Sequence, residues 1–229
     1  MKISAAIFAV AVLMLAEAGF AQSFVNLNFE SANFSGYAPG SPNVPINSAL
    51  PGWSGYFMTG TVTNQVTQVW YDGVSLGGNM LSVIDTNAFG FMPIQGKYSA
   101  FLFGEGPGFP VSAKISQTGL VPAGTLSLQA KMSWFAAAPI ITLNGQVINM
   151  VPLQTFSDYT LYGSDISSFA NQVAELSFTE PPPDQGSPSG LLLDSIVFSP
   201  QQVPEPTVLA LLGGGALLFG FFRRRNSSR

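Results

Sequence analysis

The acidic side chains are the residues of this chain that could do acid–base chemistry, because the sequence contains no histidine and no cysteine. Hydrolysis of a glycosidic bond needs two carboxyl groups about 5–10 Å apart. Asp72, Asp85, Glu105 and Glu175 are candidates, but their spacing pairs none of them. Glu105 lies in the glycine-rich segment 104–108, where a solvated charge is the ordinary interpretation. We therefore expect no enzyme and no catalytic residue.

Aromatic side chains provide a second kind of chemistry, because an exposed ring among polar neighbours can stack on the face of a sugar. Trp53 and Tyr56 are the preferred candidates for a carbohydrate site, since they lie in a glycine-rich segment. A tryptophan that follows Pro-Gly can instead fill the core, which is the alternative for Trp53. Trp70 and Trp134 lie in expected strands, where packing in the core is the favoured role. Tyr71 is a further candidate for stacking.

The elements that must position these residues are strands. Between residues 22 and 202 the sequence has short runs of β-branched and aromatic residues separated by Gly, Pro, Asn and Asp, without a long stripe of helical period. Asn144-Gly145 between apolar runs predicts a type I′ hairpin, and Asp165 is expected to cap one helical turn over residues 165–170. The expected strands are residues 24–29, 61–71, 98–103, 113–118, 125–134, 140–143, 146–148, 156–162, 173–178 and 191–198. This pattern predicts an all-β, antiparallel sandwich.

Composition excludes several classes of partner and site. Residues 22–202 contain three lysines, no arginine and ten acidic residues, a net charge of about −7, so we expect no binding to nucleic acid. The lack of cysteine means that the core, or a metal, must hold the domain together without disulfides. The lack of histidine removes the commonest ligand for zinc, copper and iron. Gly77-Gly78 is not followed by the lysine that a phosphate-binding loop requires.

Residues 1–21 are typical of a secretory signal peptide, which would form a short helix at the N-terminus. Lys2 is followed by an apolar run over residues 3–15, and small residues at Gly19 and Ala21 predict cleavage between Ala21 and Gln22. The Sec export machinery is therefore an expected partner. A retained N-terminal membrane anchor is the alternative.

The C-terminal segment predicts a short transmembrane helix. Residues 207–222 contain no charge, and at about 1.5 Å per residue they span roughly 24 Å, less than the hydrocarbon core of about 30 Å. Pro204 and Pro206 prevent helix formation just before this run. Three arginines after it indicate its cytoplasmic side. A buried core helix followed by a basic tail is the alternative.

Residues 203–229 resemble the PEP-CTERM sorting signal of Gram-negative bacteria, in which a short motif, an apolar span and basic residues follow in this order. The resemblance implies recognition by exosortase, export, transient anchoring in the inner membrane, and sorting to the cell envelope or an extracellular polymer matrix. Pro204, Glu205 and Pro206 would then be recognition elements for exosortase. The residues that make up the expected sorting signal are Val203, Pro204, Glu205, Pro206, Arg223, Arg224 and Arg225.

Three further parts of the chain resemble the galactose-binding-like jelly roll of many carbohydrate-binding modules. These parts are residues 28–30 with 50–53, residues 156–160 with 165–167 and 173–178, and residues 191–198. The resemblance implies a jelly-roll sandwich with a structural Ca²⁺ held by Glu30 and Asp194. A carboxylate in an otherwise apolar strand is costly unless it is paired or metal-bound. The alternative is that both carboxylates face solvent at strand ends.

These observations predict a signal peptide (residues 1–21), a jelly-roll domain (residues 22–202) and a sorting signal (residues 203–229). The expected function is that of a non-enzymatic exported protein of the envelope or extracellular matrix, associated with extracellular polysaccharide. A purely structural matrix protein without a glycan ligand, and a secreted polysaccharide hydrolase, are the two alternatives.

Overall fold

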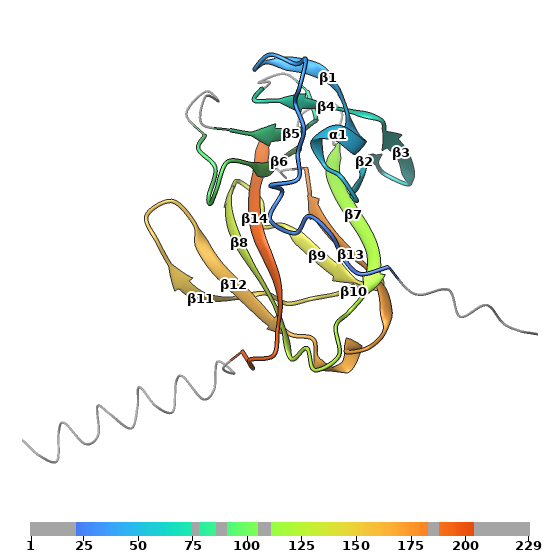
Figure 1. Cartoon of the computed structure of the whole chain (residues 1–229), viewed down its shortest axis with the longest axis vertical. Helices are drawn as coiled ribbons and strands as arrows, with labels where there is room; N and C mark the ends of the chain where they lie inside the picture. The colour runs from blue at the N-terminus through green and yellow to red at the C-terminus, as the bar shows by residue number, and fades with distance from the viewer. Residues whose placement is uncertain (1–21, 75–77, 86–90, 105–110, 183–187, 204–229) are drawn as a thin grey trace, which may run out of the picture.

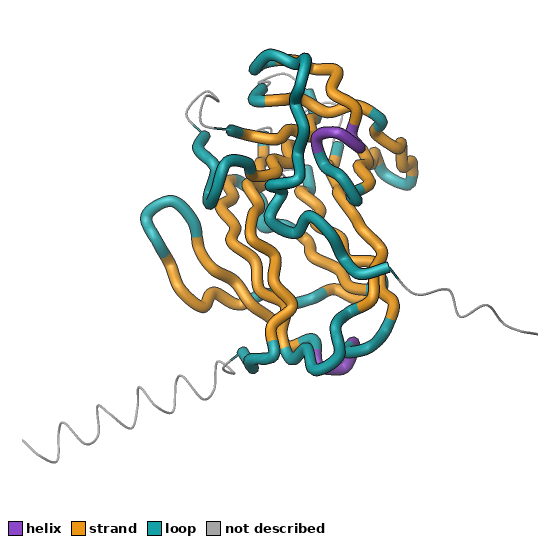
Figure 2. The backbone as a smooth tube through the Cα atoms, viewed as in Figure 1, coloured by secondary structure: helices purple, strands orange, loops and turns teal. Residues whose placement is uncertain are grey.

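The computed structural model describes residues 22–74, 78–85, 91–104, 111–182 and 188–203. These residues form two β-sheets that pack face to face (Figure 1), and the described part of the chain contains only two short helical elements (Figure 2). The predicted all-β sandwich is therefore confirmed.

The larger sheet has eight strands and the smaller sheet has six. In spatial order the larger sheet contains β1 (Ser41–Pro45), β4 (Gln68–Tyr71), β5 (Met80–Ile84), β6 (Ser99–Gly104), β14 (Ser189–Ser199), β8 (Ser127–Phe135), β12 (Thr160–Asp165) and β11 (Val151–Thr155). The smaller sheet contains β10 (Gln146–Val147), β9 (Ile140–Leu143), β13 (Val173–Glu180), β7 (Ser112–Leu120), β2 (Ser54–Thr59) and β3 (Val62–Val66). Helix α1 (Ile46–Ala49) follows β1, and a 3₁₀ turn (Ser167–Phe169) follows β12. The prediction of an antiparallel sandwich does not hold for β4 and β5, which run parallel, and an isolated bridge between Ser23 and Leu120 is also parallel.

The main core lies between the two sheets, as the alternation along β8 shows. Leu128, Ala130 and Met132 are buried in this core. Because successive side chains of a strand point to opposite faces, Gln129 and Lys131 lie on the outer face of the larger sheet. A second apolar cluster covers another part of this outer face, and its buried members are Met80, Ile84, Phe101, Phe103 and Leu192.

Local turn chemistry explains where the predicted strands hold. Asn144 and Gly145 have φ angles of 52° and 77°, and they join β9 to β10 in the expected type I′ geometry. The Oδ1 atom of Asp165 accepts a hydrogen bond from the N–H of Ser167 at 2.8 Å, at the start of the 3₁₀ turn. The predicted helical turn is therefore present, but Asp165 ends β12 and the N-cap position is Ile166.

Three of the predicted strands are wrong in extent. Residues 24–29 form an irregular segment, because Asn26 and Phe29 have φ angles of 51° and 59°, which no strand accommodates. Residues 61–71 form two strands in different sheets, β3 and β4. Residues 156–162 contain the tip of the β11–β12 hairpin as well as the first half of β12.

Candidate functional site

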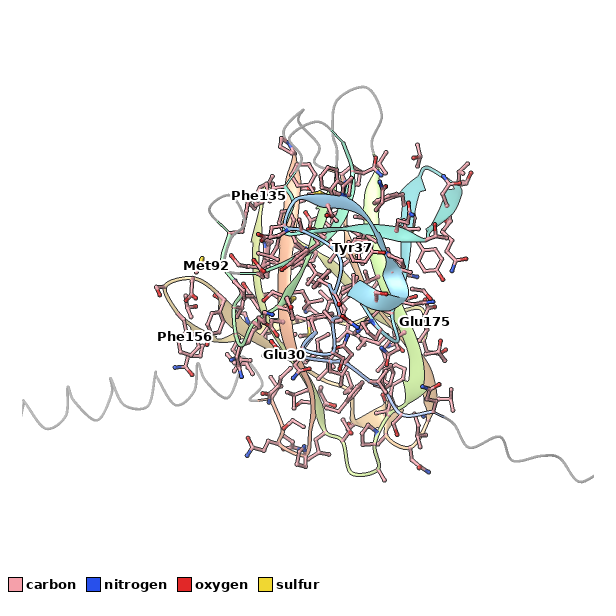
Figure 3. All side chains as sticks on the ribbon, turned by 45° about the horizontal axis from the view of Figure 1, so that its top comes forward. Glu30, Tyr37, Met92, Phe135, Phe156 and Glu175 are labelled. Carbon is pink, nitrogen blue, oxygen red and sulfur yellow. The ribbon has the colours of Figure 1, made fainter. Side chains whose placement is uncertain are left out.

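A cleft of about 340 Å³ opens beside the β11–β12 hairpin, at one edge of the larger sheet. Thr160 and Tyr162 of β12 lie opposite Met132 and Ala130 of β8, so the four side chains share the inner face of the sheet. The hairpin projects at the side of the sandwich in Figure 1, and its tip, which includes Phe156 in Figure 3, forms a wall of the cleft. We call this feature the aromatic cleft.

Two pairs of aromatic rings line the aromatic cleft. The ring centroids of Trp134 and Tyr162 lie 4.6 Å apart with an interplanar angle of 37°. Those of Phe156 and Tyr159, on either side of the hairpin tip, also lie 4.6 Å apart, at 25°. Trp134 and Tyr162 are half-buried against the main core, whereas Phe156 is exposed. The cleft therefore has aromatic walls, of which Phe156 at the rim is exposed.

Polar groups surround these rings. The hydroxyl of Ser157 donates to Oδ1 of Asp158 at 3.2 Å, and the N–H of Phe156 donates to the carbonyl oxygen of Tyr159 at 2.9 Å, which closes the tip. Lys131 approaches from the outer face, with its Nζ 5.2 Å from the centroid of the Tyr159 ring. Among the described residues that line the cleft, Asp158 is the one acid. The cleft thus combines ring faces with hydroxyls and a single carboxylate.

The two preferred carbohydrate residues lie elsewhere. Trp53 is 2% exposed, its Nε1 donates to the carbonyl oxygen of Asn26 at 3.1 Å, and its ring lies 5.8 Å from that of Phe29. A ring buried in this way cannot stack on a sugar, so the core-filling alternative applies to Trp53. Tyr56 is half-buried on β2 in the smaller sheet, beneath Lys114, and lies outside the aromatic cleft.

The remaining tryptophans and tyrosines divide between core and cleft. Tyr71 is buried and stacks on Phe34 at 3.8 Å, and Trp70 packs on the outer apolar cluster. Trp134, for which the sequence favoured the core, packs against the core and also lines the cleft. The sequence analysis missed the rings at the hairpin tip, although the Ser157-Asp158 turn between aromatic residues was a signal that could have found them.

Asp194 is a buried carboxylate that holds the loop of residues 95–99. It is 1% exposed, and its Oδ2 accepts hydrogen bonds from the N–H of Gln95 at 3.0 Å and the hydroxyl of Ser99 at 2.7 Å. A β-bulge follows it, with φ of 49° at Ser195, and the N–H of Ser195 donates to Oδ1 at 2.6 Å. Burial raises the pKa of Asp194, and these hydrogen bonds oppose the rise in part.

Glu30 binds the same loop from the other side. Its Oε1 accepts hydrogen bonds from the N–H groups of Lys97 at 2.8 Å and Tyr98 at 3.1 Å. Gly96 has a φ of 66°, and a Cβ at this position would overlap the Glu30 carboxylate, so the approach requires glycine. Glu30 lies in a turn and is exposed, which differs from the strand position that the sequence predicted.

The carboxylate oxygens of Glu30 and Asp194 do not by themselves form a coordination shell for calcium. Calcium takes six to eight oxygen ligands, but three of the four carboxylate oxygens here accept hydrogen bonds from N–H or O–H donors. No group of three or more acidic, histidine or cysteine residues that could hold a metal ion occurs among the described residues. A Ca²⁺ bound by Glu30 and Asp194 stays a prediction.

Two acids that the sequence did not pair lie together at the ends of β4 and β5. Asp72 and Asp85 are 3% and 4% exposed, and the N–H of Asp85 donates to Oδ1 of Asp72 at 3.2 Å. The hydroxyl of Tyr71 donates to Oδ2 of Asp85 at 2.6 Å. Burial, together with the neighbouring Asp85, raises the pKa of Asp72 to about 6. The parallel pairing of β4 with β5 brings both strand ends to one place, which sequence spacing did not reveal.

Glu180 is a second buried carboxylate with a different environment. It lies at the end of β13, is 0% exposed, and neither of its oxygens has a hydrogen-bond partner in the part of the chain that the structure describes. The neighbouring hydroxyl of Ser189 donates instead to the carbonyl oxygen of Pro181 at 2.6 Å. Burial raises the pKa of Glu180 to about 8, and the nearby Ser189 hydroxyl opposes this rise in part.

The other two candidate acids give no catalytic pair with these. Glu175 forms an ion pair with Lys114 at 3.1 Å. Burial favours a higher pKa for Glu175, but hydrogen bonds from Ser116 and Lys114 outweigh it and lower the pKa. Glu105 lies outside the described residues.

The start of the expected sorting signal lies directly against the sandwich. The hydroxyl of Ser127 donates to the carbonyl oxygen of Gln201 at 2.7 Å. A Cβ on Gly163 of β12 would lie 2.9 Å from Cγ2 of Val203 and 2.7 Å from Cδ1 of Leu153, so these two side chains cover Gly163. The chain after β14 is therefore attached to the sheet as far as Val203.

Both expected membrane or signal helices, residues 1–21 and 207–222, lie outside the described residues, as do the motif residues 204–206 and the arginines 223–225. Within the ranges that the structure describes, none of the helices has the length and apolar character needed to cross a membrane.

Comparison with known proteins identifies the C-terminal signal. Residues 202–226 match the PEP-CTERM protein-sorting motif, which confirms the resemblance seen in the sequence and implies exosortase-dependent export. No curated protein sequence matches the chain.

Solved structures resemble the fold at low identity. One is TmCBM61 in complex with β-1,4-galactotriose, with 13% identity over 76% of this chain and 95% of that chain, at a TM-score of 0.42. Another is the apo form of a cyclase from Fischerella sp., with 14% identity over 77% of this chain and 93% of that chain, at a TM-score of 0.45. A β-glucosidase from Kluyveromyces marxianus in complex with glucose has 10% identity over 77% of this chain and 18% of that chain, at a TM-score of 0.31.

Proposed function

We propose that this exported chain, sorted through its PEP-CTERM motif, is a non-enzymatic protein of the cell envelope or extracellular matrix that associates with extracellular polysaccharide. The observation that supports this function is the aromatic cleft, in which the pairs Trp134–Tyr162 and Phe156–Tyr159 surround a space of about 340 Å³. Sites for small ligands typically combine apolar and aromatic walls with a few polar groups that fix orientation.

The chemistry of the cleft favours binding over hydrolysis. A glycoside hydrolase needs a pair of carboxyl groups on either side of the scissile bond, whereas Asp158 is the single acid among the described lining residues. The paired carboxylates Asp72 and Asp85 are both buried, so neither meets a ligand without movement of the chain around it. A polysaccharide hydrolase is therefore the less favoured function.

The cleft is tested by glycan-array binding of variants. Phe156→Ala with Tyr159→Ala removes the rings at the hairpin tip, and Trp134→Ala removes the ring on β8; both are expected to weaken binding at least tenfold. Tyr56→Ala is the matched control, because it removes a half-buried ring from the other sheet. Loss of binding in Tyr56→Ala with retention in the cleft variants would place the ligand elsewhere. A wild-type chain that binds no glycan would favour the alternative, a purely structural matrix protein.

The sorting route is part of the same proposal. The Sec machinery would export the chain, the apolar segment 207–222 would anchor it transiently in the inner membrane, and exosortase would recognise Pro204, Glu205 and Pro206 before release. Cell fractionation with and without residues 203–229 tests this route. We expect the truncated chain to change compartment, and an identical distribution of both forms would contradict the proposal.

A structural Ca²⁺ at Glu30 and Asp194 is proposed separately, because both carboxylates bind the loop of residues 95–99 and a cation there would hold the same loop. Elemental analysis of the natively purified chain shows whether calcium is retained, and the shift in thermal midpoint on adding calcium shows whether it binds. No retained calcium and no shift would leave the two carboxylates as hydrogen-bond acceptors alone.

A further inference from the structure

A second hollow of about 560 Å³ lies on the outer face of β8, β12 and β14. Lys131 of β8 lies opposite Leu161 of β12, and Val197 of β14 lies opposite Gln129 of β8. These side chains alternate with Ala130 and its buried neighbours, so they face away from the aromatic cleft. We call this second hollow the Lys131 groove.

The walls of the Lys131 groove combine apolar surface with neutral hydrogen-bonding groups. Leu161 is half-buried and Val197 is 48% exposed, so both present apolar surface to the groove. Asn28, Gln95 and Gln129 line it with carboxamides. The β-bulge of β14 turns the chain at this point and aims Val197 into the groove, a common use of bulges beside binding sites.

Lys131 brings a positive charge that no carboxylate compensates within the described ranges of the chain. Its Nζ donates to Oε1 of Gln95, a neutral acceptor, and lies over the Tyr159 ring. Asp194 is its cross-strand partner, but the Asp194 oxygens accept from Gln95, Ser99 and Ser195. The ion pair recorded among the described residues joins Lys114 to Glu175 instead.

We propose that the Lys131 groove binds a polysaccharide whose sugars carry a carboxylate, with the carboxylate paired to Lys131. The carboxamides of Gln95 and Gln129 would bind sugar hydroxyls, and Val197 would contact the apolar face of the ring. The inference rests on the proposed association with polysaccharide, and it names the chemical class of the polymer. The groove lies mainly on the opposite face of β8 and β12. Because Lys131 also contacts the ring of Tyr159, which lines the aromatic cleft, Trp134→Ala is the cleft variant that tests the two sites separately.

The net charge of the domain limits the conditions under which this pairing is strong. Residues 22–202 have a net charge of about −7, which repels a polyanion at long range. At an ionic strength of about 0.15 M, charges more than about 8 Å apart are largely screened, whereas a pair in contact is screened much less. The pairing with Lys131 therefore dominates at physiological salt.

The test measures the dissociation constants of the full chain, purified in detergent, for two probes at physiological salt. The first probe is an oligogalacturonate, and the second is the same oligomer with its carboxyl groups reduced to alcohols. Loss of one charge-assisted contact weakens binding about tenfold or more. We expect Lys131→Met to weaken binding of the oligogalacturonate by this factor and to leave the reduced oligomer unchanged.

Three further variants complete the design. Lys114→Met is the matched control, because it removes the same charge and a comparable ring contact with Tyr56, and it should bind both probes as the wild type does. Lys131→Arg should retain binding. Val197→Glu adds a negative charge at an exposed position in the groove and should weaken binding of the oligogalacturonate alone.

Equal effects of Lys131→Met and Lys114→Met would overturn the proposal, since bulk charge would then explain the result. Equal affinity of the wild type for both probes would overturn it as well. If Trp134→Ala weakens binding of both probes while Lys131→Met and Val197→Glu change neither, the aromatic cleft stands and the Lys131 groove is wrong. If the groove variants weaken binding of the oligogalacturonate while Trp134→Ala changes nothing, the groove stands and the cleft is wrong.

Discussion

Asp194 and Glu180 are both carboxylates removed from solvent, at 1% and 0% exposure, yet they lie in opposite environments. Asp194 follows the middle of β14 at a bulge and accepts hydrogen bonds from Gln95, Ser99 and Ser195. Glu180 ends β13 and has no hydrogen-bond partner among the described residues. Burial raises the pKa of both, to about 8 for Glu180.

The difference shows that local backbone geometry, and not the extent of burial, decides whether a buried carboxylate of this sandwich accepts hydrogen bonds. The bulge after Asp194 and the loop of residues 95–99 aim N–H groups at its carboxylate. At Glu180 the chain is in regular strand pairing with β7, so its N–H groups are used in the sheet. One carboxylate therefore organises the chain around it, and the other favours a protonated, uncharged state.

The largest expected effect is that of Asp194→Ala, which leaves the buried hydroxyl of Ser99 and the partly buried N–H groups of Gln95 and Ser195 without their acceptor. A buried donor left without an acceptor costs about 1–3 kcal/mol, so we expect the free energy of unfolding to fall by more than about 3 kcal/mol in total. Urea denaturation at pH 7 measures this loss. A change below about 1 kcal/mol would mean that water replaces the carboxylate, and the contrast with Glu180 would disappear.

The pH dependence of stability is the second test, and it concerns Glu180. Below about pH 4.5, the ordinary pKa of this group, the carboxyl is protonated in the folded and unfolded chain. Between pH 4.5 and about 8 the unfolded chain releases the proton while the folded chain retains it, so the free energy of unfolding falls as the pH rises. The fall attributable to Glu180 reaches about 3 kcal/mol by pH 7.

Glu180→Gln removes the titrating group and should flatten this part of the pH profile. Urea denaturation of wild type and variant at a series of pH values from 5 to 8 measures the difference between them (about 1.4 kcal/mol per pH unit at most). Parallel profiles would show that Glu180 finds a partner or water in solution.

A smaller effect is expected for Asp72→Asn, an acid that is both buried and hydrogen-bonded. Its pKa of about 6 means that stability is lost as the pH rises from about 3.8 through 6. The amide oxygen can still accept the N–H of Asp85, and the like charge beside Asp85 is removed. We expect a gain of about 1 kcal/mol at pH 7 and none at pH 4, measured as a shift in the thermal midpoint. Destabilisation at pH 7 would show that the Asp72 charge is required.

The smallest loss of stability is expected for Asp165→Ala, because this carboxylate accepts a hydrogen bond without being buried. Asp165 is exposed and accepts from the N–H of Ser167, which lowers the pKa of Asp165. Loss of such an exposed side-chain to backbone hydrogen bond costs about 0.5 kcal/mol. Thermal denaturation of Asp165→Ala beside Asp194→Ala then separates the contribution of burial from that of the hydrogen bond, and equal losses would contradict the comparison.

The sequence predicted those parts of the fold that short-range chemistry decides. Asn144-Gly145 requires positive φ at both positions and produced the expected hairpin. Asp165 accepts a hydrogen bond from Ser167 at the start of the expected turn, although the N-cap position there is Ile166. Residues 24–29 alternate between apolar and polar as a strand does. Asn26 and Phe29 nevertheless take left-handed backbone conformations, so the strand predicted from this alternation is not formed. The β11–β12 hairpin was missed because its tip is flanked by aromatic residues that also favour strands.

The candidate site was less predictable, since contacts between distant strands build it. Trp134 meets Tyr162 because β8 pairs with β12, and Asp72 meets Asp85 because β4 pairs in parallel with β5. Trp53 was a candidate for stacking on a sugar because its segment is rich in glycine. In the structure its ring is buried, and its Nε1 donates to the carbonyl oxygen of Asn26. Composition alone indicates which residue types are available, and strand pairing decides which of them meet.

Because the side chain of Val203 packs over Gly163, only a short segment links the folded domain to its sorting signal. Val203 is the fourth residue after the end of β14 at Ser199, and four residues of extended chain reach at most about 14 Å. An enzyme that binds the residues after Val203 would therefore act within about this distance of the sandwich.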